Sequence, residues 1–564
     1  MAASGYWNRL SRKRISRRRV LAATGAGAAG LAIAAACGDS GDSTTAEPTL
    51  AATAGVPKYG GIFKNATSAV IDTLDPHLSI AAATAYFPRI YNLLVARSPV
   101  DPDFFYYDLA ESFEQPDETT WIFSLRPNVQ IAPNRLGVPE RNMDATDLFE
   151  SFERIKGLDE STAAAFVKNW FASHEASEDG LTYTITTPSS YAWFLFNLGA
   201  YTSMTPPREL IAGDVERLRN SAVGGGPFSV DADDYVESER LLLNKNPNYY
   251  RTDPNNNDAQ LPYIDGMELS IIGDRAALRT AFLSQQSHAY MPGSQAEADE
   301  LTSDYDVYVA SDEPVFWFVS ITMNIEEPPF DNPDVRRAVM HSIDREQYVN
   351  LIYQGGAQAN GIVHWPTGEY ALPPEELDEL QKFDPELSKQ LLTEAGFDLP
   401  LKIKAMFPSG IEIQELDAHI PIFLEHMRAA GFEVEQDPLD LGTWIDRYTN
   451  KNYSMSLSLN QIYETPETPL NFHHSRGPLG DDIYANGLQD SAIDAEIDRV
   501  KTITDPEELV EAVHEVQRMI YAVGPTFLPI VSASNLDLYW NFVTNYPSNI
   551  GQLHRIVNDW WLDI

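Results

Sequence analysis

Helix caps and strand-like runs alternate along most of this chain, and no internal repeat period is visible. The strand-like runs are rich in aromatic and β-branched residues or alternate in polarity, as strands do. They are residues 121–125, 182–186, 401–405 and 432–435. With 564 residues, the chain is long enough for two to four domains with sizeable cores. The alternation predicts α/β lobes.

Each predicted helix begins at a short polar residue whose side chain can accept a hydrogen bond from the first turn. These residues are Asp144, Asn332, Asp344, Asp384 and Asp505. Proline follows three of them, at the position where a helix tolerates it best. Glycine is expected to end three of the helices, at Gly157, Gly396 and Gly524.

The first 36 residues carry seven basic residues and no acidic one, and they end in a weakly apolar run from Leu21 to Ala36. A basic segment before a short apolar run is typical of a secretory signal. The run is too short and too weakly apolar for a membrane span. Arg17 and Arg18 stand directly before it and resemble the pair of a twin-arginine signal. An ordinary secretory signal with surplus arginines is the alternative.

Cys37 is the one cysteine of the chain. Small residues precede it and Gly38-Asp39-Ser40 follows, a pattern that resembles a prokaryotic lipobox, whose cysteine is lipidated. A stray buried thiol is the alternative. Lipidation would anchor the protein to the outer face of the membrane. A single cysteine also excludes an intrachain disulfide framework and a cysteine-rich metal site.

Residues 37–56 contain no aromatic residue and read as a flexible tether. The predicted organisation is therefore a signal at 1–36, the tether at 37–56 and a binding body at 57–564.

The chain holds 82 acidic against 40 basic residues, a net charge of −42. This excess excludes general binding to nucleic-acid backbones, which requires a cationic face. The hydrophobic content of 43% is that of a globular protein, not of a disordered acidic chain. We interpret the charge as a solubilising surface, with attraction of cationic solutes as the alternative.

A series of short segments occurs in an order that resembles the extracytoplasmic solute-binding proteins of family 5, the peptide/nickel-type receptors of ABC importers. Each is weak alone, but together they cover nearly the whole body. They include residues 59–63, 74–76, 91–95, 108–113, 121–126, 144–148, 151–154, 223–228, 246–250, 335–338, 343–345 and 391–397.

The resemblance implies an α/β, two-lobed periplasmic-binding-protein-like type II fold with an extra inserted subdomain. Lobe 1 would combine residues 57–90, 183–280 and 516–564. The inserted subdomain would take 91–182, and lobe 2 would run from 281 to 515.

The resemblance also implies a monomeric lipoprotein on the extracytoplasmic face of the membrane. It would capture an oligopeptide or similar solute between its lobes and deliver it to ABC permease subunits and, through them, to ATPase subunits. No cofactor and no nucleic acid are expected. A nickel-chelate or oligosaccharide receptor is an alternative on the same fold, and an exported hydrolase is an alternative of another class.

Residues 460–469 lie where the family's peptide receptors carry an aspartate that pairs with the peptide's α-amino group. Tryptophan and aspartate are absent here, and the nearest carboxylates are Glu464 and Glu467. We expect one of them to meet a cationic ligand group, with Gln461 beside it. A solvent-exposed acidic loop is the alternative. Trp317, Trp444 and Tyr463 are expected as an apolar cleft wall, or else as core residues.

Other motifs predict no further chemistry. Gly224-Gly225-Gly226 lacks the Lys-Ser/Thr of a phosphate loop and predicts a tight turn. His473 and His474 are read as neighbours on a strand, with side chains on opposite faces, so no metal site is expected. No nucleophile or zinc-protease motif is present, and no catalytic residue is expected.

Overall fold

The structure is a computed structural model of the whole chain, in which residues 57–564 form one compact unit. It describes residues 55–68, 71, 73–78, 86–97, 105–161, 163–200, 203–212, 215–254, 256–312, 317–409, 416–461, 465–477, 487–533, 535–546 and 558–564. Arg17, Arg18 and Cys37 lie outside these ranges. No helix within them is long and apolar enough to cross a bilayer.

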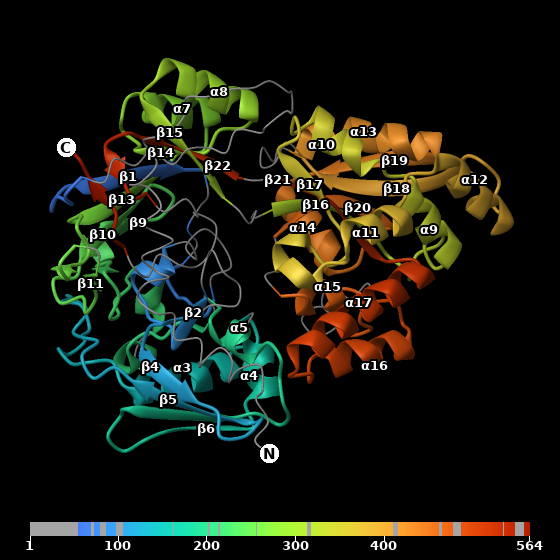
Figure 1. Cartoon of the computed structure of the whole chain (residues 1–564). Helices are drawn as coiled ribbons and strands as arrows, with labels where there is room; N and C mark the ends of the chain where they lie inside the picture. The colour runs from blue at the N-terminus through green and yellow to red at the C-terminus, as the bar shows by residue number, and fades with distance from the viewer. Residues whose placement is uncertain are drawn as a thin grey trace, which may run out of the picture. The chain divides into compact units, whose positions relative to one another are not determined.

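The first lobe is built on a mixed sheet (Figure 1). Its strands are β1 (Ile62–Thr67), β13 (Gly266–Ile271), β10 (Arg240–Lys245), β8 (Phe228–Ser229) and β9 (Tyr235–Val236). β1 runs parallel to β13, and β10 runs antiparallel to it. Phe63, Leu243 and Leu269 are buried in the core that these strands share with the C-terminal Trp560 and Leu562.

A second sheet of this lobe is completed by a strand from the far end of the chain. β22 (Asn535–Trp540) pairs antiparallel with both β14 (Ala289–Tyr290) and β15 (Val307–Asp312). Helices α7 (Arg275–Leu283) and α8 (Gln295–Asp304) pack on it, as Figure 1 shows. Phe282, Leu301 and Leu538 lie in their common core.

The inserted subdomain is an antiparallel sheet of β4 (Ala110–Glu114), β5 (Thr120–Leu125), β7 (Thr182–Thr186) and β6 (Ser173–Ala176), in that order. Helices α3 (Ala145–Gly157) and α4 (Ala164–Trp170) pack together beside it. Asp144 caps α3 as predicted, and Asp147 returns a hydrogen bond to the cap's N–H. The strands predicted at 121–125 and 182–186 are confirmed.

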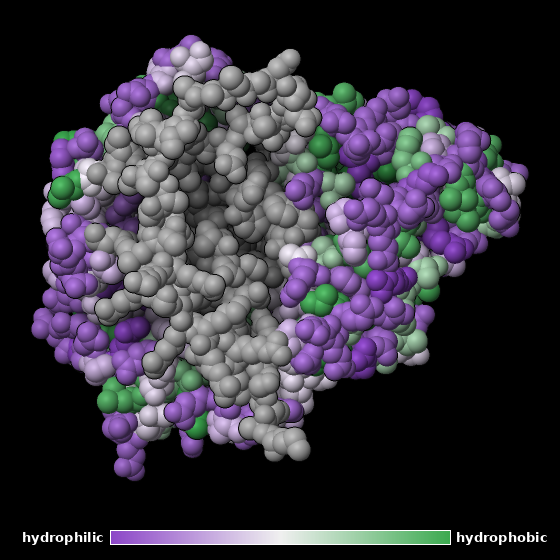
Figure 2. All heavy atoms as spheres, in the orientation of Figure 1, coloured by the Kyte–Doolittle hydropathy of each residue, from purple (hydrophilic) through white to green (hydrophobic). Residues whose placement is uncertain are grey.

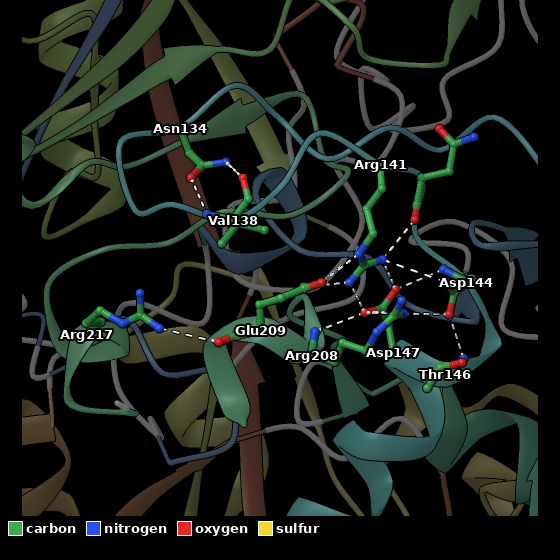
Figure 3. A network of polar contacts seen from close by, with 10 residues as sticks. Asn134, Val138, Arg141, Asp144, Thr146, Asp147, Arg208, Glu209 and Arg217 are labelled. Atoms are coloured by element: carbon green, nitrogen blue, oxygen red, sulfur yellow. Dashed lines mark hydrogen bonds and ion pairs between the residues drawn. The ribbon is translucent and has the colours of Figure 1, made fainter. Parts of the chain in front are cut away.

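Asp147 is the centre of a buried ion network that ties α3 to α6 (Arg208–Ile211) (Figure 3). Its side chain is fully buried and accepts hydrogen bonds from both terminal nitrogens of Arg141, at 2.8 and 2.6 Å. It also accepts from the backbone N–H groups of Asp144 and Arg208, each at 2.9 Å. Arg141 bridges onward to Glu209 at 2.9 and 2.6 Å.

We expect acid to weaken this network. Burial alone would raise the pKa of Asp144 and of Glu209, but hydrogen bonds from Arg208 and Arg141 hold both pKa values below their ordinary 3.8 and 4.5. The unfolded chain therefore binds more protons in this range, so the stability that the network contributes near neutral pH is lost as the pH falls below about 4.5. Urea unfolding between pH 7 and 3 measures this loss. In Glu209→Gln the free energy of unfolding should depend less steeply on pH.

The second lobe is one mixed sheet in the order β17-β21-β16-β20-β18-β19. The strands are β17 (Ala357–Ala359), β21 (Phe527–Ala533), β16 (Trp317–Met323), β20 (Met455–Gln461), β18 (Leu401–Pro408) and β19 (Phe432–Leu439). β18 is parallel to β19 and β20, whereas β16 is antiparallel to β20 and β21. The predictions at 401–405 and 432–435 are confirmed.

Helices cover both faces of this sheet, with α10 and α13 on one side and α11 and α14 on the other (Figure 1). Their bounds are α9 (Pro333–His341), α10 (Arg345–Leu351), α11 (Pro374–Leu380), α12 (Pro385–Glu394), α13 (Leu416–Ala429), α14 (Leu441–Thr449), α15 (Glu467–Asn471), α16 (Ser491–Val500) and α17 (Pro506–Val523). The caps predicted at Asn332, Asp344, Asp384 and Asp505 each accept a backbone N–H.

The strand pairing divides the lobes differently from the boundaries predicted at 281 and 515. Residues up to Asp312 pair within the first lobe through β22, whereas α17 and β21 pack in the second lobe up to Ala533. The inserted sheet likewise continues through β7 to Thr186, beyond 182. The chain therefore passes from one lobe to the other between Asp312 and Trp317, and again between Ala533 and Asn535.

The glycine triplet is a site of close backbone approach, which is more than the predicted tight turn. A Cβ atom on Gly224 or Gly226 would lie 2.5 or 2.6 Å from the carbonyl oxygen of Ile90. The N–H of Gly225 donates to Asn92 Oδ1 at 2.9 Å. Only glycine fits there, so the triplet is a packing requirement.

The remaining elements are short. They are β2 (Val95–Arg97), β3 (Phe105–Tyr107), β11 (Thr252–Asp253), β12 (Ala259–Gln260), β23 (Val543–Thr544), β24 (Trp561–Leu562), α5 (Phe194–Leu198), η2 (Phe87–Arg89), η4 (Val215–Arg219), η5 (Ala232–Asp234) and η6 (Trp365–Tyr370). Where Figure 2 colours the surface, hydrophilic residues predominate and apolar ones are scattered, in keeping with the acidic composition.

Candidate functional site

Two of the predicted ligand-binding positions face each other across neighbouring strands. Trp317 opens β16 and is paired in register with Gln461, the last residue of β20. Phe318, the next residue of β16, pairs with Ser532 near the end of β21. The chain passes between the lobes after Asp312 and after Ala533, next to this end of the sheet. The backbone therefore brings Trp317 and Gln461 to the junction of the lobes.

Of the other residues predicted to bind solute in this segment, only Glu467 is described. Tyr463 and Glu464 lie outside the described residues, as do the side chains of Trp317 and Gln461. Glu467 is described: it is the first residue of α15 and is half-buried.

The Glu467 carboxylate accepts hydrogen bonds from two side chains outside the second lobe. Its Oε2 accepts a hydrogen bond from the Tyr191 hydroxyl at 2.5 Å and one from Asn197 Nδ2 at 3.2 Å. Asn197 Nδ2 also donates to the Tyr191 hydroxyl oxygen at 2.6 Å. A charged acceptor makes such bonds stronger than those between neutral groups. Glu467 thus joins α15 to the segment that follows the inserted sheet.

Packing fixes the position of Tyr191. Its ring stacks face to face on Trp170 of α4, with centroids 3.7 Å apart and planes at 1°. Asn197 lies on α5, whose Phe194 stacks on Trp121 of the inserted sheet. Sequence analysis missed Tyr191 and Asn197, because they lie far along the chain from Glu467 and no local pattern marks them.

Trp444 is a core residue, which is the second of the two alternatives expected for it. Its indole N–H donates to Ser456 Oγ at 3.0 Å, and its ring stacks on Tyr448. Tyr448 stacks in turn on Tyr453, and Met406 completes the cluster. The spacing of Trp444 and Tyr448, four residues apart on α14, was the signal for a buried helix face.

His473 and His474 lie in a turn after α15, not on the strand that was assumed. Burial lowers the pKa of His473 to about 4, so its ring is neutral at pH 7, and Nδ1 donates to the Pro469 carbonyl at 3.1 Å. His474 Nδ1 accepts from the Arg476 N–H at 3.0 Å. Within the described ranges, no group of three or more His, Cys, Asp or Glu residues is arranged to hold a metal ion.

Curated relatives align with part of this chain. Heme-binding protein A of Haemophilus influenzae is 27% identical over 335 residues, which cover 55% of this chain and 57% of that protein. The dipeptide-binding protein of Escherichia coli is 24% identical over 340 residues, with coverages of 56% and 59%. The chain thus spans less than two thirds of the length of these relatives.

The fold is shared over a much longer stretch. The periplasmic binding protein DppA of Helicobacter pylori, solved in complex with the peptide STSA, superposes with a TM-score of 0.75 at 19% identity. The match covers 90% of this chain and 99% of that one. The chain therefore has the α/β, two-lobed fold of these binding proteins, as the sequence predicted.

A family model matches residues 105–479, which run from the inserted subdomain through α15 of the second lobe. The model describes bacterial extracellular solute-binding proteins, family 5. This range is well over half of the chain, and it includes both partners of the Tyr191–Glu467 hydrogen bond. The protein therefore belongs to family 5 of the bacterial extracellular solute-binding proteins.

Proposed function

We propose that the protein is the substrate-binding component of an ABC importer, which captures an oligopeptide or similar solute between its lobes and delivers it to permease subunits. The observation that carries this proposal is the family match over residues 105–479. The peptide-binding relatives support the choice of solute class. A solute that binds the closed form better than the open form shifts the population towards closure, which the permease then recognises.

The arrangement of the second lobe supports a solute site at residues 461–467. This segment follows β20 at the end of the sheet that adjoins both lobe crossings. We propose that Trp317, Gln461 and Tyr463 line the site and that a carboxylate of this segment meets a cationic group of the solute. Glu464 is the stronger candidate, since Glu467 Oε2 already accepts two hydrogen bonds.

The test begins with the solute that the protein retains on purification, identified by mass spectrometry. Titration calorimetry with di-, tri- and tetrapeptides should then give saturable binding, and each peptide should be recovered uncleaved. Haem, nickel with histidine, and oligosaccharides form the comparison panel. If one of these compounds binds tightly and no peptide binds, that compound's class would replace peptides as the proposed solute. Cleavage of a peptide would support the hydrolase alternative.

We further propose that Cys37 carries a lipid and that export uses the twin-arginine route through Arg17 and Arg18. The lipobox-like sequence and the basic segment support this proposal. An acyl anchor holds through burial of its methylene groups, at about 0.8 kcal/mol each.

Cys37→Ala is accordingly expected to move most of the protein from the membrane fraction to the soluble extracytoplasmic fraction. Cell fractionation with immunoblotting measures the change, and Ser40→Ala is the matched control because it leaves the cysteine in place. Retention of Cys37→Ala in membranes after a high-salt wash would contradict the anchor.

A further inference from the structure

One short segment of the inserted subdomain makes several contacts with the second lobe. The segment runs from Ser190 to Asn197, directly after the inserted sheet. The N–H of Ala192 donates to the carbonyl of Lys501 at 2.7 Å, and the hydroxyl of Ser190 donates to the carbonyl of Thr502 at 2.8 Å. Tyr191 and Asn197 donate to Glu467, as described above.

These contacts are separate from the covalent crossings. The crossings join β15 to β16 and β21 to β22, which are strands of the two lobe sheets. The contacts instead join the inserted subdomain to α15 and to the turn between α16 and α17. The lobes are thus linked in two ways: by the continuity of the chain from β15 to β16 and from β21 to β22, and by hydrogen bonds from residues 190–197.

The partners of Tyr191 are arranged so that its hydroxyl has a defined direction. The parallel stack on Trp170 fixes the ring. The hydroxyl oxygen accepts a hydrogen bond from Asn197 Nδ2, and the hydroxyl donates one to Glu467 Oε2. A donor held in place in this way loses little conformational entropy when it meets the carboxylate, so the bond favours the arrangement in which α15 lies against the inserted subdomain.

We propose that Tyr191 and Asn197 are positioning residues for solute capture: through Glu467 they hold the second lobe against the inserted subdomain and so set the closed fraction of the protein before solute arrives. This inference rests on the proposed function, since it assigns the contact to closure around a solute. When the form that binds solute is only partly populated, the apparent Kd equals the Kd of that form divided by its population.

Tyr191→Phe is the central variant, because it removes the hydroxyl and keeps the stack on Trp170. Glu467→Ala removes the acceptor, and Tyr305→Phe is the control, since Tyr305 is a surface residue of the first lobe whose hydroxyl makes no contact between lobes. Spin labels at Glu178→Cys and Ala495→Cys, in a Cys37→Ala background, report the distance between the inserted subdomain and α16 by pulsed electron resonance. Melting temperatures confirm that each variant is folded.

Without solute, Tyr191→Phe and Glu467→Ala should both shift the label distances towards longer values, and the control should not. Each should raise the Kd of the retained solute by about tenfold, the effect of losing one charge-assisted hydrogen bond. The double variant should be no worse than either single one. Unchanged distances in both variants would overturn the proposal.

A second result would also overturn it. If Glu467→Ala weakens binding while Tyr191→Phe changes neither affinity nor distance, Glu467 acts on the solute and not between the lobes. Neither result affects the receptor assignment. If instead no solute binds at all, the proposed function fails, while the distances without solute still decide whether residues 190–197 hold the lobes together.

Discussion

Asp147→Asn is expected to lower the free energy of unfolding by about 3–5 kcal/mol, the usual cost of breaking a buried ion pair on one side. The carboxylate has no exposed surface and accepts two hydrogen bonds from Arg141 and two from backbone N–H groups. An amide would turn an NH₂ group towards some of these donors and would leave Arg141 with less compensating charge. Chemical denaturation followed by tryptophan fluorescence measures the loss.

Asp159→Asn is the matched control for this substitution. Asp159 also pairs with a cation, Lys168, at 2.7 Å, but its side chain is 91% exposed. Exposed pairs contribute about 0–1 kcal/mol, so this variant should unfold almost as the parent does. If both variants lose the same free energy of unfolding, burial of the Asp147 carboxylate does not explain how much it contributes to stability.

Glu464→Gln is expected to weaken solute binding by about 2–5 kcal/mol if the solute carries an ammonium group, because that charge would be left desolvated and unpaired. The expectation rests on the sequence position of Glu464, three residues after β20 ends at Gln461. Titration calorimetry with the identified solute is the measurement.

Glu433→Gln provides the comparison, since Glu433 is an exposed residue of β19 in the same lobe. The free energy of solute binding to Glu433→Gln should stay within about 0.5 kcal/mol of that of the parent protein. If Glu464→Gln binds the solute with unchanged affinity, Glu464 does not contact the solute. If the solute is a neutral sugar, it has no cationic group for Glu464 to meet.

Local signals in the sequence predicted local structure well. The caps at Asp144, Asn332, Asp384 and Asp505 were correct because a cap is a contact between a side chain and a backbone N–H two or three residues later. The four predicted strands were correct for a similar reason, since alternation of polarity is visible within five residues.

Long-range pairing was not visible in the same way. Strand pairing ends the first lobe's run at Asp312 and the second lobe's run at Ala533, because β15 pairs with β22, more than two hundred residues along the chain. Tyr191 and Glu467 are also distant in sequence, and nothing near either residue indicates the other. Trp444 lies in the core, one of the two alternatives that the sequence left open, and its helix spacing with Tyr448 is in keeping with that position.

The place of β22 also determines the order in which this protein can be completed. β22 is the middle strand of its sheet, so β14 and β15 have no common partner until residue 540 has been synthesised. The second lobe, in contrast, is continuous from β16 to β21 and has all its strands by residue 533. The lobe that is begun first is therefore finished last, and its unpaired strand edges remain open to wrong partners throughout synthesis.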